Sequence, residues 1–471
     1  MDEHEREITI EKIITALDHV QLLKAASGNV RPDEIAQAIL ILRATLENAH
    51  PAEIAQAMRH VVPEAQEQVM DLLSPEVASE SLLSLRGIDE GAGIELAEEL
   101  DSDELSEMLN VMEPDDAADV VADLPEEDAV EVLDLMEDEE SRNVQELLRY
   151  PEDTAGGIMT PEFTALRTDM TIDEAIQHLR ENPPGRQIFY IYVIGEEEKL
   201  LGTVPLDRLV TEAPHRKLKD IALSDVISVT PDVDREEAAR LVTQYDMLAL
   251  PVVDEQNRLL GVITIDDVMD TLQEEATEDI YKLAGTSDDE LLSRSAFRVA
   301  QLRLPWLFVC LGGSLFSGFI IRIFSGTITQ AIAIASFIPA IMAMGGNTGL
   351  QSSTATVRGI ATGYISISKV AGIVLKEIRT ALIMGIACGF AMALVAFLWK
   401  GRQTTLGLVV GSSIFLAVSL SATMGVLIPI VFKRMNVDPA IASGPLITMI
   451  NDITGLAVYL TLATILLSRL S

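Results

Sequence analysis

The residue best placed to do chemistry is a carboxylate inside the last apolar stretch of the chain. Asp452 lies well within the apolar run 440–468, about 20 Å along a helix that rises ~1.5 Å per residue. The hydrocarbon core of a bilayer is ~30 Å thick, so an acid at this depth costs roughly 2.5–3.5 kcal/mol to insert. Such a side chain needs water, a cation or a partner. We interpret Asp452 as part of a polar path for ions; the alternative is a hydrogen-bonded aspartate that packs helices.

A second polar segment lies in the apolar stretch 328–356. Its centre, Gly346 to Gln351, is dense in small and polar side chains, and Thr448 and Asn451 flank the buried acid of the last stretch. Hydroxyl, amide and carboxylate oxygens can accept hydrogen bonds from the water shell of a cation. Glycines at four-residue spacing also let membrane helices pack closely, so packing is the alternative for this segment. The candidate path residues are Asp452, Asn347, Asn451, Thr448, Gly346 and Gln351.

Charge is divided sharply between the two ends of the chain. Of 73 acidic side chains only Glu377, Asp438 and Asp452 lie beyond residue 294, where 12 of the 34 basic ones are found. A strongly anionic, water-soluble part is therefore joined to an apolar, slightly basic part that can cross a membrane. So negative a surface is a poor partner for nucleic acid, which is bound by clustered Lys and Arg. The composition points to cations instead.

Carboxylates are also concentrated just before the membrane part. They recur at spacings of three and four residues on and at the entry of a helix that we predict over 271–292, so they share adjoining faces. Crowded carboxylates repel one another, and a divalent cation between them turns repulsion into bridging. Such a helix can pass movement of the soluble domains to a pore. The candidate metal-binding residues here are Asp266, Asp267, Asp270, Glu275, Glu278 and Asp279.

The first third of the chain contains a repeat of 12 residues. Pro51, Pro63 and Pro75 each precede an apolar run, and the same interval continues to about residue 149. Acids and proline suit the first turn of a helix, so each unit predicts one short helix and a turn. Short helices bury their apolar stripes only by stacking on their neighbours, which predicts a helical superhelix. Most of its acids are then a solvated outer face.

Residues 150–275 contain a tandem repeat with an offset of 59 residues. Phe189 to Ile194 and Leu200 to Val204 predict paired strands in the first copy, and Leu250 to Asp254 and Leu259 to Ile263 in the second. This pattern of strand, glycine turn, strand and Asp-headed helix resembles tandem CBS domains. That resemblance implies an adenine nucleotide such as ATP as an extra ligand, with Tyr190 as a stacking partner. The alternative for Tyr190 is a buried strand tyrosine.

Five apolar stretches, 303–323, 328–356, 378–399, 405–432 and 440–468, predict five membrane spans. The loops on one side carry nine Lys and Arg residues against four on the other, and the positive-inside rule therefore places the N-terminus in the cytosol and the C-terminus outside. The acidic start shows no cleavable signal. These features predict a multi-pass protein of the cell (inner or plasma) membrane that contacts the lipid bilayer.

The order of these features resembles the MgtE family of magnesium channels and transporters over essentially the whole chain. The resemblance is carried by the acidic helical repeats, the junction Tyr150 to Gly157, the CBS-like pair, the linking helix and the segments Gly346 to Gln351 and Asn451-Asp452. It implies a homodimer whose five helices per subunit line a central path for Mg²⁺, with cytosolic Mg²⁺ as the closing signal. Asp452 matches the intramembrane filter carboxylate of the family. The sensing positions of the family match Asp267, Asp270, Glu275, Glu278 and Asp279.

The expected architecture is a multidomain membrane protein. It comprises an α-helical superhelical N-terminal domain over 1–149, tandem α/β CBS domains over 150–213 and 214–273, a linking (plug) helix over 274–298 and an all-α transmembrane domain of five helices over 299–471. The expected function is potential-driven Mg²⁺ uptake, closed by cytosolic Mg²⁺, with Mg²⁺ as both cargo and regulator.

Two other functions stay open on the sequence. One is a membrane-anchored CBS nucleotide sensor, and the other is transport of other divalent cations such as Co²⁺, Mn²⁺ or Ca²⁺, since all accept oxygen ligands. An enzyme is not expected, because no nucleophile–base pair or catalytic metal constellation emerges.

Overall fold

The computed structural model describes residues 3–25, 32–183, 187–287, 290, 295–365, 370–399, 404–442 and 444–466. These residues form two compact units, Met1–Gln273 and Glu274–Ser471. Each unit is considered by itself.

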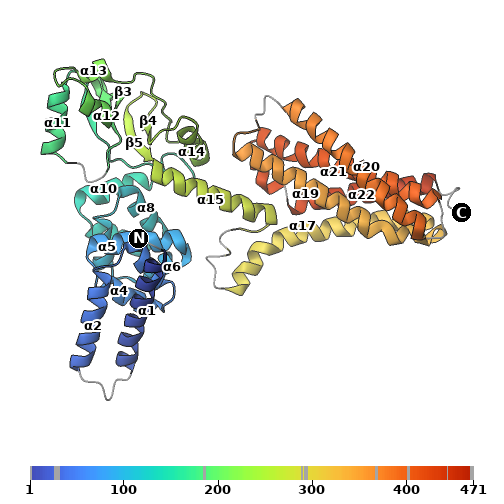
Figure 1. The fold of residues 1–471 in the computed structure, drawn as a ribbon, viewed down its shortest axis with the longest axis horizontal. Helices are drawn as coiled ribbons and strands as arrows, with labels where there is room; N and C mark the ends of the chain where they lie inside the picture. The colour runs from blue at the N-terminus through green and yellow to red at the C-terminus, as the bar shows by residue number, and fades with distance from the viewer. Residues whose placement is uncertain are drawn as a thin grey trace. The chain divides into compact units, whose positions relative to one another are not determined.

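The first unit begins with two long helices, α1 (Glu3–Ala25) and α2 (Pro32–Leu46), which pack against each other. The predicted series of short helices follows (Figure 1). Pro51, Pro63 and Pro75 each occupy the first turn of a helix, where the missing N–H is not needed. The helices are α3 (Pro51–Met58), α4 (Pro63–Met70), α5 (Pro75–Ile88), α6 (Glu90–Glu99), α7 (Ser102–Leu109), α8 (Pro114–Asp123), α9 (Glu126–Leu135) and α10 (Asp138–Leu147).

The helical series stacks in the way that a repeat predicts. Each helix contacts the second helix beyond it, as α3 does with α5, α5 with α7, α7 with α9 and α8 with α10. Ile54, Leu82 and Leu105 are among the side chains that this stacking buries completely or nearly so. The acids of the first turns lie mostly outside this core, as the period of the sequence predicted.

Both copies of the tandem repeat form a strand pair followed by a helix. In the first, β1 (Ala165–Arg167), β2 (Tyr190–Ile194) and β3 (Leu200–Pro205) make a sheet in which β1 is parallel and β3 antiparallel to β2. In the second, β4 (Ala249–Val253) and β5 (Leu259–Thr264) are antiparallel. The helices of this region are α11 (Ile172–Glu181), α12 (Leu206–Thr211), α13 (Leu218–Ile221) and α14 (Arg235–Gln244), with the short 3-10 helix η1 (Glu196–Glu198).

The linking helix α15 (Ile265–Ala284) has bounds that differ from the prediction of 271–292. It begins directly after β5, because Asp266 and Asp267 favour a first helical turn. It ends before Gly285, whose φ of +78° is a conformation that glycine adopts without strain. Of the segment predicted to continue the helix, residues 288–289 and 291–294 lie outside the described residues.

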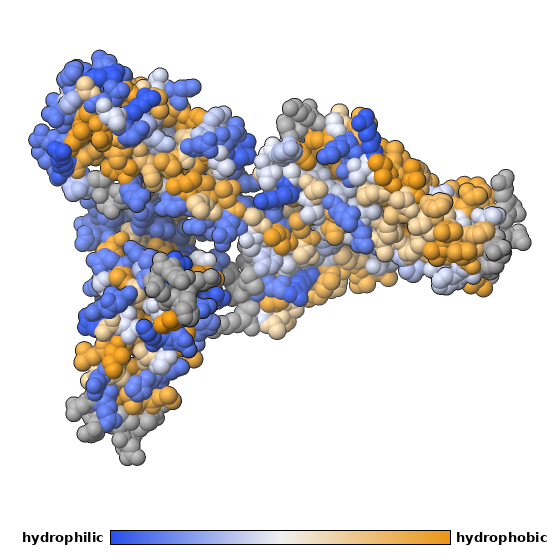
Figure 2. Space-filling model, in the orientation of Figure 1, coloured by the Kyte–Doolittle hydropathy of each residue, from blue (hydrophilic) through white to orange (hydrophobic). Residues whose placement is uncertain are grey.

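Five helices of the described residues are long and apolar enough to cross a membrane, as predicted. They span α17 (Ala296–Ile323), η2 with α19 (Ile332–Phe337 and Ile338–Ala361), α20 (Val370–Trp399), α21 (Thr404–Arg434) and α22 (Pro445–Ile465). Short helices α18 (Ser325–Gln330) and η4 (Pro439–Ala442) connect them. Helix α21 packs against α19, α20 and α22, and α17 packs against α22. Apolar residues cover broad areas of this unit's surface (Figure 2), which suits contact with lipid.

Candidate cation path and acidic clusters

Helix α19 exposes a polar face although its sequence is apolar enough to cross a membrane. Asn347, Gln351, Thr354 and Arg358 are all exposed, at intervals of four, three and four residues. These intervals place them on one side of the helix. Amide and hydroxyl groups that face hydrocarbon lose their hydrogen bonds to water. This side of α19 is therefore expected to border water or a second protein chain.

The carboxylate of Asp452 on α22 lies beside the glycines of α19. The residue is partly exposed in the single chain, as is Thr448 one turn earlier. A Cβ atom at Gly346 would lie 3.3 Å from Thr448 Cγ2 and 3.8 Å from Asp452 Oδ1. The structure thus brings three of the predicted path residues together. The absence of a side chain at Gly346 leaves the space next to the acid open.

Asn451 lies on a different side of α22 from its neighbour in the sequence. It is 1% exposed, and a Cβ atom at Gly349 would lie 1.8 Å from its Nδ2 atom. Neither side-chain polar atom of Asn451 has a hydrogen-bond partner among the described residues. A buried amide without partners costs roughly 1–3 kcal/mol. Its role in the path, which the sequence suggested beside Asp452, stays a prediction.

A further acid of the membrane unit was not predicted to have a role. The hydroxyl of Ser352 on α19 donates to Glu377 Oε1 on α20 at 2.5 Å, and Ser352 is buried. This bond ties α20 to the helix that carries the polar face. The signal in the sequence was the rarity of acids beyond residue 294, of which Glu377 is one.

In the first unit, acids from two distant segments meet. Asp115 and Asp116 in the first turn of α8 lie near Asp267, and Asp116 also lies near Asp266 and Asp270 at the start of α15. Burial, with these neighbouring charges, raises the pKa of Asp116 to about 7 and raises the pKa of Asp115 well above its usual range. Two acids of α8 that the sequence did not single out thus add their negative charge to the carboxylates at the start of α15.

Asp267 also has a structural task at the start of α15. Its Oδ2 atom accepts hydrogen bonds from the backbone N–H of Thr264 at 3.2 Å and from the Thr264 hydroxyl at 2.5 Å. These bonds hold the carboxylate at the junction of β5 and α15. One carboxylate oxygen is thus directed to the strand, and the neighbouring acids of α8 lie close by.

The second half of α15 forms another charged cluster, within the membrane unit. Lys282 Nζ lies 2.5 Å from Glu278 Oε1 and 2.7 Å from Asp438 Oδ2. Burial raises the pKa of Asp279 to about 6, and the charge of Asp438 adds to that rise, whereas Lys282 opposes it. Of the predicted metal-binding residues, Glu278 and Asp279 therefore meet Asp438, which precedes η4 and which the sequence reasoning did not assign.

The end of α15 packs on the start of α22. A Cβ atom at Gly444 would lie 2.1 Å from the carbonyl oxygen of Leu283, and one at Gly285 would lie 2.7 Å from Pro445 Cγ. Gly444 approaches the backbone of Leu283 and Gly285 approaches the ring of Pro445 so closely that only glycine fits at either position without a shift. Thr448 and Asp452 follow on the same helix, so α15 contacts the first turn of the helix that carries the path acid.

The cation sites suggested by these acids are open clusters of oxygen donors. Among the described residues, no three His, Cys, Asp or Glu side chains converge closely enough to hold a bare metal ion. Mg²⁺ usually keeps several waters and is bound through one or two carboxylates. The donor chemistry and the crowding of Asp116 with Asp266, Asp267 and Asp270 fit a hydrated divalent cation.

Tyr190, the predicted stacking partner for a nucleotide, lies at the start of β2 and is partly buried. Its hydroxyl accepts a hydrogen bond from the backbone N–H of Leu248 at 3.3 Å, which joins the two copies of the repeat. It packs in a cluster with Tyr192 and Val253. This environment favours a packed strand tyrosine, and the nucleotide role of Tyr190 stays a prediction.

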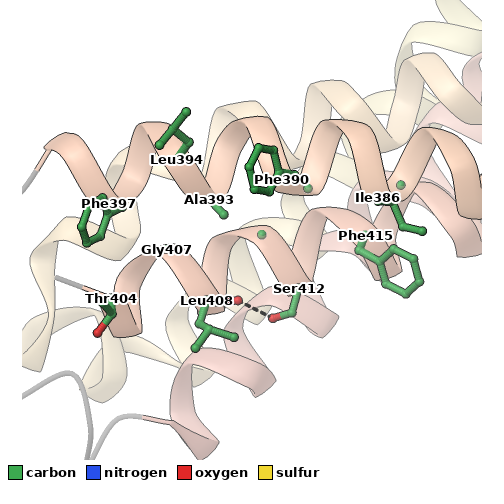
Figure 3. Close-up of a pocket in the computed structure, with 13 residues that line it drawn as sticks. Ile386, Phe390, Ala393, Leu394, Phe397, Thr404, Gly407, Leu408, Ser412 and Phe415 are labelled. Carbon is green, nitrogen blue, oxygen red and sulfur yellow. Dashed lines mark hydrogen bonds between the residues drawn. The ribbon is translucent and has the colours of Figure 1, made fainter. Parts of the chain in front are cut away.

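A groove of about 480 Å³ lies between α20 and α21 (Figure 3). None of the polar-face residues of α19 lines it. Its walls are mostly apolar side chains and glycines, including Phe390, Phe397 and Phe415. Ser412, one of its few polar residues, donates its hydroxyl to the carbonyl oxygen of Leu408 at 2.7 Å. The groove has no acid in its lining and is unsuited to a cation.

The stability of the first unit is expected to depend on pH through Glu104 on α7. Burial raises the pKa of Glu104 from an ordinary value of 4.5 to about 7, and the charges of Asp71, Glu67 and Asp101 add to that rise. A raised pKa means that the folded state holds the proton more tightly, so the stability from this group is present below pH 4.5 and is lost as pH rises through about 7. Glu104→Gln is expected to raise the unfolding midpoint by about 2–4 °C at pH 8, and hardly at all at pH 5.

This expectation is checked by thermal unfolding of the full-length protein, followed by circular dichroism in chelator at both pH values. Glu107→Gln, an exposed acid of the same helix, is the matched control and should leave the midpoint unchanged. An equal shift of Glu104→Gln at pH 5 and pH 8 would contradict a titration effect.

Family profiles match most of the chain. The profile described as a divalent cation transporter, MgtE, matches residues 338–462. The MgtE intracellular N domain matches residues 49–153, and the CBS domain matches residues 155–215 and 218–274. The last match confirms the two copies of the repeat.

Curated relatives are similar over about two thirds of the chain. The magnesium transporter MgtE of Bacillus subtilis is 38% identical over 321 residues, which are 68% of this chain and 71% of that protein. The magnesium transporter MgtE of Thermus thermophilus is 38% identical over 326 residues, 69% of this chain and 72% of that protein.

Two solved structures are similar to about half of the chain. The cytosolic domain of the Mg²⁺ channel MgtE in complex with ATP is 35% identical, with a TM-score of 0.46, and covers 50% of this chain and 94% of that one. The soluble part of a magnesium transporter is 27% identical, with a TM-score of 0.48, and covers 57% of this chain and 99% of that one. With its N-terminal domain, CBS pair and transporter region all matched and its identity to curated relatives, the chain belongs to the MgtE family of magnesium transporters.

Proposed function

We propose that this chain forms a homodimeric, magnesium-selective channel or transporter that takes Mg²⁺ into the cell and closes when cytosolic Mg²⁺ rises. The observation that carries the proposal is the polar face of α19 beside the acid of α22. Asn347 and Gln351 are exposed on a membrane helix, and the partly exposed Asp452 adjoins the same helix at Gly346. A second subunit that covers these faces would enclose them around water, because they are unsuited to lipid.

The chemistry of Mg²⁺ explains why such a path need not contain a closed metal cage. The ion loses its inner waters reluctantly, so a pore that removed them all would hold it too long. Two Asp452 carboxylates, one from each subunit, supply about two negative charges to match the ion. Asn347, Thr448 and backbone carbonyls then accept hydrogen bonds from its water shell. Charge and water geometry together select the ion.

Closure is proposed to follow from the two acidic clusters. The carboxylates of α8 and of the start of α15 repel one another, as the raised pKa of Asp116 indicates. Cytosolic Mg²⁺ bound among them removes this repulsion and draws the segments together. The second cluster, with Glu278, Asp279 and Asp438, lies where α15 meets the membrane unit. Since the end of α15 packs on the start of α22, a shift of α15 is transmitted to the helix that carries Asp452.

Uptake is expected to depend on the membrane potential. A divalent cation that enters a cell whose interior is 100 mV negative gains about 4.6 kcal/mol, so accumulation should rise roughly 10³-fold at equilibrium. We would reconstitute the protein in liposomes, impose a potassium diffusion potential with valinomycin, and follow internal Mg²⁺ with an indicator dye. Vesicles without the potential are the control. Uptake that ignores the potential would contradict a path for a charged ion.

The same assay separates the two alternative functions. A membrane-anchored sensor with no path would give vesicles no flux above that of empty ones. A transporter whose main cargo is Co²⁺ or Mn²⁺ would carry these ions faster than Mg²⁺ at equal concentration. The polar face of α19 and the intramembrane acid Asp452 favour transport over a mere anchor, because an anchor gains nothing from them.

A further inference from the structure

A basic side chain occupies the second acidic cluster. Lys282 in the last turn of α15 lies between Glu278, one turn earlier, and Asp438, just before η4. Its ammonium nitrogen lies 2.5 Å from Glu278 Oε1 and 2.7 Å from Asp438 Oδ2. Two carboxylates from different segments of the chain thus share the ammonium group of one lysine.

The cluster is partly shielded from water. The side chains of Lys282, Glu278 and Asp438 are 28%, 32% and 32% exposed, and Asp279 lies close enough to feel the charges of both Asp438 and Lys282. Charges at such a depth interact more strongly than fully exposed ones. The ammonium group is therefore bound more strongly than it would be in a single exposed ion pair.

We propose that the ammonium group of Lys282 competes with cytosolic cations for the second acidic cluster, the closing site formed by Glu278, Asp279 and Asp438. This competition makes the closing site respond to divalent cations rather than to K⁺. The proposal rests on the closure by cytosolic Mg²⁺ described above and assigns one further residue to it. A cation that binds here must first displace the ammonium group from Glu278 and Asp438. The concentration of Mg²⁺ that closes the path is then set partly by Lys282.

The valence of the competitor decides the exchange. Replacing the ammonium by K⁺ exchanges one positive charge for another, and the tether gives the lysine a millimolar or higher effective concentration. Mg²⁺ brings twice the charge to the same carboxylates and has Asp279 as an additional acid nearby. A divalent ion can therefore win the exchange, whereas a monovalent ion gains nothing from it.

The test uses the full-length protein in liposomes with Lys282→Gln. Loss of the competitor is expected to lower the internal Mg²⁺ concentration at half-closure about fivefold to thirtyfold, which corresponds to two ion pairs of about 0.5–1 kcal/mol each. K⁺ should now compete: replacing internal K⁺ by N-methylglucamine should lower the midpoint further in the variant and leave the wild type unchanged. Lys282→Arg, which keeps the charge, should behave like the wild type in both titrations.

A second readout does not require flux. The rise of the thermal unfolding midpoint with added Mg²⁺ should begin at lower Mg²⁺ in Lys282→Gln than in the wild type, because ion binding to the folded state stabilises it. Lys433→Gln, an exposed lysine at the end of α21, is the matched control and should move neither titration. If the glutamine variant does not fold, Lys282→Met carries the same test.

Two results would overturn the inference. An unchanged midpoint with no K⁺ effect would mean that the lysine does not compete, and a higher Mg²⁺ midpoint would mean that it stabilises the closed form. Failure of the proposed function looks different, because wild-type flux itself would then ignore internal Mg²⁺. In that case the thermal titration still decides whether Lys282 competes with a bound cation.

Discussion

Asp452→Asn is expected to lower Mg²⁺ flux at least ~100-fold. The substitution keeps the size of the side chain and removes the negative charge beside Gly346 and Thr448. At a few ångströms and an effective dielectric constant of about 20, a single pair of unit charges is worth about 4 kcal/mol, and ~3 kcal/mol already corresponds to about 100-fold. The measurement is initial uptake into liposomes without internal Mg²⁺, so that closure does not interfere.

Two variants control this experiment. Asp452→Glu keeps the charge and should retain more flux than the asparagine variant, because a hydrated ion tolerates a change of about one methylene better than loss of charge. Asp438→Asn removes another acid of the same unit, outside the membrane-spanning helices, and should leave flux unaffected in Mg²⁺-free vesicles. Flux in Asp452→Asn equal to that of the wild type would place the path elsewhere.

The second large effect is expected from neutralising Asp267, Asp270 and Glu275 together. With Asn, Asn and Gln at these positions, the path should stay open at internal Mg²⁺ concentrations that close the wild type. Moving a two-state equilibrium from 1:99 to 99:1 needs about 5.5 kcal/mol of differential binding, which several weak sites share at about 1 kcal/mol each. Loss of three contributions should raise the midpoint roughly 100-fold. Flux as a function of internal Mg²⁺ measures this shift.

The matched control neutralises three exposed acids of α9, Glu126, Glu127 and Asp128. This variant changes the net charge of the chain by the same amount and should close like the wild type. If both triple variants stay open, the total charge matters rather than the cluster. If the first variant closes normally, the sensing residues have been misassigned.

Much of the fold could be predicted because the sequence repeats its local signals. The prolines at 12-residue intervals mark the starts of α3, α4 and α5, and the duplicated strand pair appears as β2–β3 and β4–β5. The five apolar stretches became five long helices. In each case the local pattern of apolar residues agrees with the burial that the fold requires. The pattern alone therefore identifies the helix or strand. The end of α15 was placed too late, because its stop depends on the backbone conformation at Gly285.

The candidate site was harder to predict because its residues meet through tertiary packing. Asp116 and Asp267 lie about 150 residues apart in the sequence, and so do Lys282 and Asp438. No local pattern links either pair. The sequence also did not show which way Asn451 faces. Neighbours on a helix point about 100° apart, so Asn451 and Asp452 face different surroundings, and these depend on how the helices pack. Gly349 leaves room for Asn451 on the buried side, and only the packing of α19 on α22 shows this.

The close approach of Leu283 to Gly444 has a consequence for building chimaeras of this protein. A Cβ atom at Gly444 would overlap the Leu283 carbonyl, so the last turn of α15 and the residues at the start of α22 form a joint in which the two surfaces must be complementary. A soluble half transplanted from a homologue with a seam after residue 285 would bring a foreign surface to this joint. A seam at Gln273, where the two units divide, keeps both surfaces from the same parent.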